Sequence, residues 1–355
     1  MALLNTWASQ QDQATLSPLS RALNTYIQKG NAPLSYLLRG DTQGLLKDLN
    51  TPRPVDITQD MVNTALNVNP VSGLLSKAIT QGPKYSSLLG KSDIEQSATN
   101  RLITQYPELK QQYNALNLPH AETKGGIILN SDAARELFPE YVADRTLSAQ
   151  VHEPASTFVK KLYAEKLSQP TPAGLQNTVV FTAGGTGAGK TSAIRTASKS
   201  AGDNLNKAEM IYDTNMNTFK SANDKIQQAL KTGRDVQIFY TYRDPIESLT
   251  KGALTRASTM EKNFGSGRTV PLSEHLKTHI GSRNTIDELA NKYKDNPNVQ
   301  ISAIDNSKGK GNAKRIELSD LPKLNEQEIR KKLNDALEKS KPNISEAIYR
   351  GTKDY

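Results

Sequence analysis

The segment GGTGAGKT, Gly184 to Thr191, constrains the fold more than any other part of this sequence. It fits the pattern G-x-x-x-x-G-K-[ST] and stands between an apolar run, TVVFTA (178–183), and a helical pattern, TSAIRTASKSA (191–201). Such a loop turns tightly at its glycines, aims backbone N–H groups inward and leads into the positive end of a helix dipole. The sequence therefore predicts a phosphate-binding loop between a buried strand and a helix.

Each position of this loop has an expected contact with a nucleotide, either ATP or GTP. The predicted binding residues are Gly184, Gly185, Thr186, Gly187, Ala188, Gly189, Lys190, Thr191 and Ser192. Lys190 is expected to reach the β- and γ-phosphates, and the Thr191 hydroxyl to complete the coordination of Mg²⁺. The alternative is a glycine-rich strand-to-helix turn that only resembles the motif.

The apolar runs predict an α/β fold. Besides 178–183, they cover 125–130, 210–213, 236–242 and 299–305, and helical patterns lie between them, at 131–138, 155–167 and 221–230. Short apolar strands that alternate with helices form a mostly parallel sheet with both faces covered. We therefore expect a P-loop NTPase-like or kinase-like sheet flanked by helices.

The chain divides into three predicted regions. Residues 1–95 are rich in Asn, Gln, Ser, Pro and Leu and read as a helical N-terminal extension or adaptor. Residues 96–306 carry every motif, and their first helical pattern, up to Leu118, has a predicted break at Pro107. Residues 307–355 form a charged, helical C-terminal tail.

Composition excludes several classes of protein. Cysteine is absent, which rules out disulfides, thiolate metal sites and cysteine nucleophiles. No signal peptide or apolar run long enough to span a bilayer is visible, so we expect a cytoplasmic protein, or one delivered into a bacterial cytoplasm. The net charge of +9 is spread thinly along the chain, which favours a solvated surface over nucleic-acid binding.

Two aspartates follow predicted strands. Asp213 ends MIYD, the place for a carboxylate that touches a metal or its water shell, although it could instead form an Asx turn with Thr214 and Asn215. Asp132, in NSD, also lies at the carboxyl end of a strand, where ligands of open α/β sheets bind. The alternative is that Ser131 or Asp132 is an ordinary helix N-cap.

Three arginines follow the fourth strand, Arg243, Arg256 and Arg268. A guanidinium can stabilise the charge of a transferred phosphoryl group, and the glycine-rich segment 264–268 has the composition of a lid. The alternative is that these arginines are only solvated. His275 and His279 could face one way on a helix, but no third ligand accompanies them, so a zinc site is not favoured. HEPAS (152–156) reads as the turn before a helix.

These residues resemble the zeta toxin family of P-loop kinases, whose members phosphorylate UDP-N-acetylglucosamine or related small metabolites. The resemblance covers about Gly125 to Asn306. Beyond the generic GGTGAGKTS, it is carried by ILNSDAARELFPEY and by the long run from IYDTNMNTFKSANDKIQQALKTGRDVQIFYTY to RDPIESLTKGALTRA. It implies that Asp132 activates the acceptor, that Asp213 is an acidic site residue, and that Arg256 and Arg268 are the arginines of the following helix and of the lid.

The sequence departs from the family pattern in two ways. The aspartate segment of the family follows the nucleotide loop, whereas NSD here precedes Gly184, so either the strand order is permuted or Asp132 is a false match. Asp213 also replaces a glutamate. A permutation keeps the catalytic ends of parallel strands at one edge of the sheet whichever strand the chain visits first.

The expected function is therefore a zeta-type kinase that transfers the γ-phosphate of ATP or GTP to a small acceptor hydroxyl, such as that of a UDP-N-acetyl sugar, and acts as a toxin. The resemblance also implies an antitoxin partner. One rival is an NTP-binding structural or delivery component of a larger phage- or plasmid-related assembly, docked through residues 1–95 and without turnover. The other is a polynucleotide kinase.

Overall fold

The computed structural model describes residues 92–118, 120–201 and 207–353. Their centre is a six-stranded sheet with the order β3-β5-β4-β6-β7-β8. The strands are β3 (Ile128–Asn130), β4 (Gln176–Ala183), β5 (Ala208–Asp213), β6 (Asp235–Tyr242), β7 (Val299–Asp305) and β8 (Lys314–Ile316). All neighbours from β3 to β7 pair in parallel, and β8 pairs antiparallel with β7. The predicted α/β fold class is confirmed.

The first predicted strand is shorter than expected. It was expected over 125–130, but β3 begins only at Ile128. Lys124, Gly125 and Gly126 have φ angles of 49°, 69° and 83°, so the chain turns here and cannot be extended. The apolar pattern could not show this, because it does not report backbone conformation.

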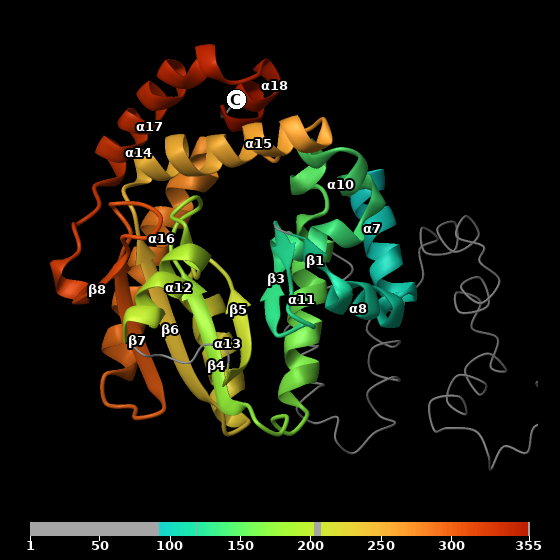
Figure 1. Ribbon diagram of the computed structural model, residues 1–355, viewed down its shortest axis with the longest axis vertical. Helices are drawn as coiled ribbons and strands as arrows, with labels where there is room; N and C mark the ends of the chain where they lie inside the picture. The colour runs from blue at the N-terminus through green and yellow to red at the C-terminus, as the bar shows by residue number, and fades with distance from the viewer. Residues whose placement is uncertain (1–91, 119, 202–206, 354–355) are drawn as a thin grey trace, which may run out of the picture. The chain divides into compact units, whose positions relative to one another are not determined.

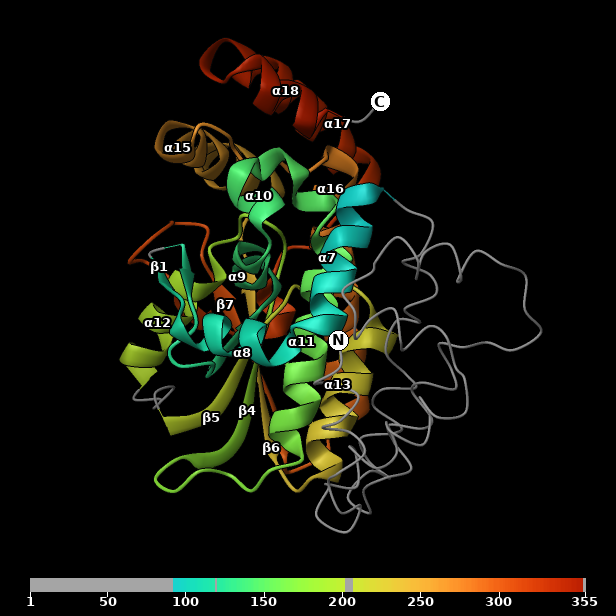
Figure 2. The ribbon, with the colours of Figure 1, turned by 90° about the vertical axis from the view of Figure 1, so that its right-hand side faces the viewer.

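Helices cover both faces of the sheet (Figures 1 and 2). α12 (Lys190–Ala201) lies on one face, against β6 and β7. α11 (His152–Leu167) and α13 (Phe219–Lys231) lie on the other. The HEPAS segment belongs to α11, which begins at His152, so the expectation of a turn before the helix is wrong there.

The segment before the sheet is helical, as its pattern predicts, but the break lies elsewhere. α7 (Asp93–Thr104) and α8 (Tyr106–Ala115) meet at Gln105. Pro107 was expected to be the break, yet it stands in the first turn of α8, where its missing N–H removes no helix hydrogen bond. Short elements follow up to α11: β1 (Asn117–Leu118), β2 (Ala121–Glu122), α9 (Ser131–Ala134), η2 (Arg135–Leu137), α10 (Pro139–Ala143) and η3 (Arg145–Ala149).

A helical layer stands above the carboxyl edge of the sheet (Figure 1). Its elements are α14 (Pro245–Ser248), the π-helical η5 (Leu249–Leu254), α15 (Thr255–Phe264), α17 (Glu326–Ser340) and α18 (Glu346–Thr352), with the short turn η7 (Lys341–Asn343). The long helix α16 (Leu272–Tyr293) begins against this layer and then runs beside α13, and the short turn η6 (Leu318–Asp320) precedes α17. Ile329, Leu333 and Leu337 of α17 are buried in one apolar cluster with Leu249 and Leu272.

The three-region division of the chain remains a prediction. Residues 1–91 of the predicted extension lie outside the described residues. The predicted tail holds α17 and α18 but also the edge strand β8, which belongs to the sheet. None of the helices within the described ranges is long and apolar enough to cross a membrane.

Candidate active site

The glycine loop connects β4 to α12, and its glycines are required by packing as well as by turning. Gly187 has φ 76°, and a Cβ there would stand 2.2 Å from the backbone oxygen of Ser248. A Cβ at Gly185 would meet the ring of His279 at 2.3 Å. The loop is therefore enclosed by α14 on one side and α16 on the other, and neither position accepts a larger residue.

Two histidines of α16 bind backbone carbonyl groups of the glycine loop and of α14. His279 Nε2 lies 3.0 Å from the Thr186 carbonyl oxygen, and His275 Nε2 lies 2.9 Å from that of Pro245. Thr278 Oγ1 accepts a hydrogen bond from Thr186 N at 3.1 Å. Burial lowers the pKa of both histidines, that of His275 to about 4, so each is neutral and donates from Nε2. Within the described ranges, no group of three or more His, Asp or Glu side chains could hold a metal ion by itself.

Lys190 points back across the loop. Its Nζ donates to Asn215 Oδ1 at 2.6 Å and lies 3.4 Å from the Gly184 carbonyl. Burial lowers the pKa of Lys190, while the nearby charges of Asp213 and Asp132 act in the opposite direction. The amine is therefore held by a side chain that sequence reasoning treated only as part of a turn.

Asp213 is fixed by the two strands beside it. Thr182 Oγ1 donates to Asp213 Oδ1 at 2.6 Å, and Asn130 Nδ2 donates to Oδ2 at 2.8 Å. Asn130 and Asp213 are register partners at the ends of β3 and β5. The carboxylate is thus anchored at the carboxyl edge of the sheet by its neighbours in space.

Asp132 stands on α9 and is not its cap. The N-cap is Asn130, whose Oδ1 accepts from Asp132 N at 2.6 Å, so the expectation that Ser131 or Asp132 caps this helix is wrong. The Asp132 carboxylate is paired instead, with Arg268 Nη1 2.5 Å from Oδ2 and Arg135 Nη1 donating to Oδ1.

The charge state of Asp132 follows from these neighbours. Burial alone would raise the pKa of Asp132, but Arg268, Arg135 and Arg256 outweigh it and hold that pKa well below its usual range. The side chain is still 39% exposed, whereas those of Arg268 and Arg135 are each 9% exposed. Asp132 is therefore an ionised carboxylate with one open side, set among buried cations.

Arg256 lies on α15 and holds free hydrogen-bond donors. Its Nε and Nη2 are buried without a hydrogen-bond partner. The charge of Arg268, followed by burial, lowers the pKa of Arg256 to about 10, so it is still a cation at neutral pH. Two buried cationic donors without an acceptor are costly, and an anion such as a phosphate would satisfy them.

The glycine-rich segment 264–268 is fixed to η3. Ser266 Oγ accepts from Arg145 N at 2.8 Å, and the Arg145 guanidinium stacks over the Phe264 ring at 4.0 Å. This conformation places Arg268 beside Asp132. The composition of the segment predicted a lid, which stays a prediction; the structure shows the segment in contact with η3.

The remaining predicted residues serve other parts of the site. Arg243 is not among the arginines that act on Asp132; its Nε lies 3.7 Å from Oε2 of Glu247, a long ion pair. Thr191 is exposed in the first turn of α12, and Ser192 Oγ donates to the Gly189 carbonyl at 3.0 Å. The structure thus brings together Asp132, Lys190, Arg256 and Arg268 but not Arg243.

Sequence reasoning missed several residues that build the site. Arg135 could have been found from its i,i+3 spacing to Asp132, which puts both on one helical face. Asn215 and Thr278 carried no signal, because their partners are distant in sequence. The same holds for Asn306, whose Nδ2 donates to the Ala188 carbonyl at 2.8 Å.

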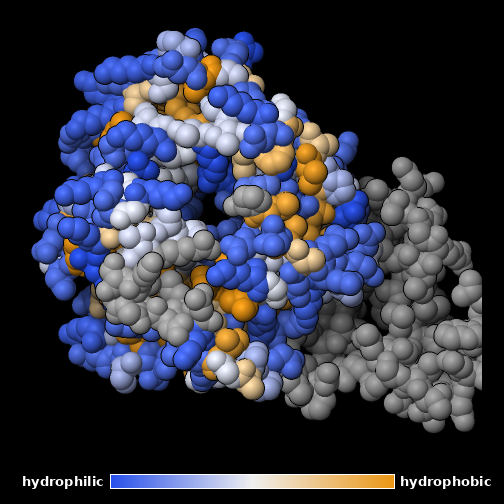
Figure 3. Space-filling view, viewed as in Figure 1, coloured by the Kyte–Doolittle hydropathy of each residue, from blue (hydrophilic) through white to orange (hydrophobic). Residues whose placement is uncertain are grey.

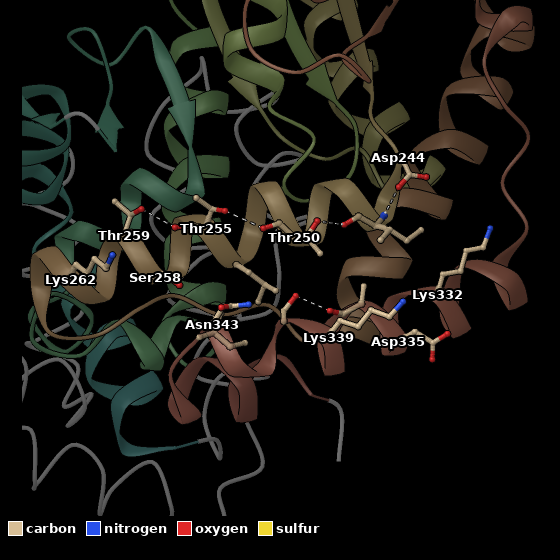
Figure 4. Close-up of a pocket in the computed structure, with 15 residues that line it drawn as sticks. Asp244, Thr250, Thr255, Ser258, Thr259, Lys262, Lys332, Asp335, Lys339 and Asn343 are labelled. Atoms are coloured by element: carbon tan, nitrogen blue, oxygen red, sulfur yellow. Dashed lines mark hydrogen bonds between the residues drawn. The ribbon is translucent and has the colours of Figure 1, made fainter.

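Two hollows are visible near this edge of the sheet. Figure 3 shows a mainly hydrophilic face with a hollow between the upper helices and the sheet. A separate groove of about 840 Å³ lies between η5, α15 and α17 and is lined by Thr255, Lys262, Lys332 and Lys339 among others (Figure 4). None of the residues of the glycine loop lines that groove, so the two are different sites.

The sheet order, the glycine loop and the anchored carboxylate define a P-loop kinase-like α/β fold. The family model described as Zeta toxin matches residues 202–312, less than half of the chain. Asp213, Arg256 and Arg268 lie within the match, and Asp132 and the glycine loop lie before it. The matched segment is similar to the zeta toxin family of P-loop kinases, which supports a phosphotransferase in general terms. No curated protein matches the chain.

Proposed function

We propose that this protein is a zeta-type kinase that transfers the γ-phosphate of ATP or GTP to the hydroxyl group of a small acceptor. One observation carries the proposal. An ionised carboxylate, Asp132, faces the cations Lys190, Arg256 and Arg268 at the carboxyl edge of a P-loop sheet. A base, a phosphate-binding lysine and two arginines are the groups that phosphoryl transfer requires.

The nucleotide would be held by the loop. Backbone amides from Gly184 to Gly189 and the Lys190 amine would bind its phosphates. Thr191 and Asp213 supply a hydroxyl and a carboxylate oxygen, the hard donors that Mg²⁺ prefers, so these residues fit the ion. Mg²⁺ would supply charge neutralisation at the phosphates.

Asp132 would orient the acceptor hydroxyl and take its proton. A carboxylate with so low a pKa is a weak base, but the loose transition state of phosphoryl transfer needs little proton removal before the phosphoryl group moves. Arg256 would offer its two unpartnered donors to the phosphoryl oxygens. Arg268 would share its charge between Asp132 and the phosphoryl group.

The early position of Asp132 in the chain is compatible with this role. β3 is parallel to β5, so its carboxyl end reaches the same edge as Asp213 although the chain forms β3 first. We propose that the segment around β3 and α9 is a permuted counterpart of the family's aspartate segment. Parallel pairing at the sheet edge is the observation that supports it.

The acceptor follows from the charge of the site. Arg135, Arg256, Arg268 and Lys190 exceed the carboxylates Asp132 and Asp213 by two positive charges, which favours an anionic acceptor such as a UDP-N-acetyl sugar. A kinase that removes such a metabolite in the cytoplasm would act as a toxin and would need an antitoxin partner.

The test is a panel of acceptors. Purified protein is incubated with γ-labelled ATP or GTP, Mg²⁺ and either UDP-N-acetylglucosamine, other nucleotide sugars or a 5′-hydroxyl oligonucleotide. Label on a nucleotide sugar supports the proposal. Label on the oligonucleotide would identify a polynucleotide kinase, and nucleotide binding with no transfer to any acceptor would favour a structural or delivery component.

A further inference from the structure

Asp132 has a second arginine partner, Arg135, which has no role in the proposed transfer step. Arg135, in η2, is buried, and its Nη1 donates to Asp132 Oδ1. Its other terminal nitrogen, Nη2, lies 2.7 Å from Nδ1 of His152, the first residue of α11. One guanidinium therefore joins the candidate base to the HEPAS segment.

The direction of these contacts is set by chemistry. Arginine is always protonated in proteins and has no acceptor, so His152 Nδ1 accepts from Nη2 and the imidazole carries its proton on Nε2. Partial burial, followed by the charge of Arg135, lowers the pKa of His152, which keeps Nδ1 available as an acceptor at neutral pH. A protonated ring would instead point an N–H at the guanidinium.

We infer that Arg135 and His152 are positioning residues for Asp132: His152 fixes the orientation of the Arg135 guanidinium, which in turn fixes the carboxylate toward the acceptor. This inference rests on the proposed function, because it assigns Asp132 the role of base. Neither residue is assigned to the nucleotide or to the phosphoryl group.

The Arg135–His152 contact explains how the Asp132 carboxylate could stay oriented during the reaction. Arg268 and Arg256 also face Asp132, but they are the groups expected to turn toward a phosphoryl group. Arg135 instead donates to Oδ1, the carboxylate oxygen that Arg268 does not contact, and is held by His152 of α11, so its contact can persist throughout the reaction. The carboxylate then keeps Oδ1 fixed, while Oδ2 can meet the acceptor once Arg268 turns toward the phosphoryl group.

The first experiment observes the contact itself, in full-length protein without acceptor. Selective ¹⁵N labelling of the four histidines, with His152→Asn used to assign the His152 signal, reports its tautomer and titration. We expect the Nε2–H tautomer in the wild type and a higher pKa of His152 in Arg135→Gln, because a neighbouring positive charge is lost. Arg330→Gln removes the charge of an exposed arginine on α17 and is the matched control. An unchanged His152 titration in Arg135→Gln would overturn the inference.

The second experiment measures its effect on transfer, with ATP and UDP-N-acetylglucosamine as the probe. Loss of such a supporting contact costs about 10- to 100-fold in activity, and we expect that loss in kcat for Arg135→Lys and His152→Leu, with KM for ATP unchanged. His152→Asn keeps an acceptor near the position of Nδ1 and should recover most of the rate. Because His152 is exposed and Arg135 is buried, we expect His152 variants to fold even where those of Arg135 do not.

The pH profile separates positioning from mere loss of structure. Other groups also interact with the Asp132 carboxylate, namely Arg268, Arg256, Lys190, Tyr141 and His152. In Arg135→Gln these groups remain, so the pKa of Asp132 should rise partway and the acid limb of the kcat profile should move to higher pH. A structural role alone would reduce the amount of active enzyme and leave the profile in place, which would refute the inference.

Failure of the proposed function gives a different result. If the wild type transfers no phosphate to UDP-N-acetylglucosamine, the proposed acceptor is wrong, and a ¹³C titration of the Asp132 carboxyl replaces kinetics. A higher pKa of Asp132 in Arg135→Gln but not in Arg330→Gln would still support the arrangement. Equal pKa values in both would overturn it.

Discussion

Replacing Asp132 by asparagine tests the candidate base and the electrostatics around it together. The change keeps the size of the side chain but removes the counter-charge of Arg268 and Arg135. Breaking a fully buried ion pair costs about 3–5 kcal/mol, and an exposed pair contributes about 0–1 kcal/mol. Asp132 is 39% exposed while its partners are buried, so solvent screening reduces the loss to about 1–2 kcal/mol.

The pH dependence of this loss has a defined sign. The pKa of Asp132 is held below its unfolded value, so its contribution to the free energy of unfolding is complete above that value, about 3.9, and disappears as pH falls through the folded pKa. The difference between wild type and Asp132→Asn should therefore be present at pH 7 and shrink in strong acid. Denaturant unfolding of both proteins at pH 7 and in strong acid measures this difference.

Catalysis should suffer far more than stability. Loss of a general base typically reduces the rate by about 10²- to 10⁴-fold, and nucleotide affinity should be unchanged or tighter because the site becomes more positive. Asp287→Asn removes a carboxylate that also pairs with an arginine, Arg283, and serves as the control. Phosphoryl transfer at the wild-type rate by Asp132→Asn would refute the assignment of the base.

Three other changes test different parts of the account. Lys190→Ala should abolish nucleotide binding or turnover with the fold intact, whereas the exposed Lys220→Ala should bind as the wild type does in calorimetry. Because the pKa of His275 is lowered to about 4, its neutral form contributes up to about 3 kcal/mol to the free energy of unfolding; this contribution is complete above about pH 6.5 and is lost as pH falls toward 4. The slope of the free energy of unfolding against pH should flatten in His275→Gln, and an equal slope in both proteins would contradict the expectation. Removal of residues 1–91 should leave a domain that still binds nucleotide, and an aggregated product would show that the boundary is wrong.

Most of the sheet could be predicted because four of its strands are marked by a local apolar pattern in the sequence. The runs ending at Ala183, Asp213, Tyr242 and Asp305 are short, apolar and closed by polar residues, and each became a parallel strand. β8 and the turn at Lys124 could not be predicted, since an edge strand of three residues with one apolar side chain and a left-handed turn leave no apolar pattern.

The candidate site could be predicted only in part, because many of its contacts join residues that are distant in sequence. Motif spacing and family resemblance pointed to Asp132, Lys190, Arg256 and Arg268, and the fold brings them to one edge. Their supports are set by contacts across the fold: Asn215 reaches Lys190 over 25 residues and Thr278 reaches Thr186 over 92. The N-cap was misassigned because Asn130, Ser131 and Asp132 are all good caps, and only geometry distinguishes them.

The most direct measurement is a crystal structure of the protein with Mg²⁺ and a non-hydrolysable ATP analogue. The account predicts that the triphosphate lies in the loop from Gly184 to Thr191, with γ-phosphate oxygens about 2.7–3.2 Å from Lys190 Nζ and from the unpartnered nitrogens of Arg256. It also predicts that Asp132 faces the γ-phosphate. A triphosphate bound elsewhere, or one in the loop with Arg256 and Asp132 turned away from it, would contradict the central claim that these residues form one phosphoryl-transfer site.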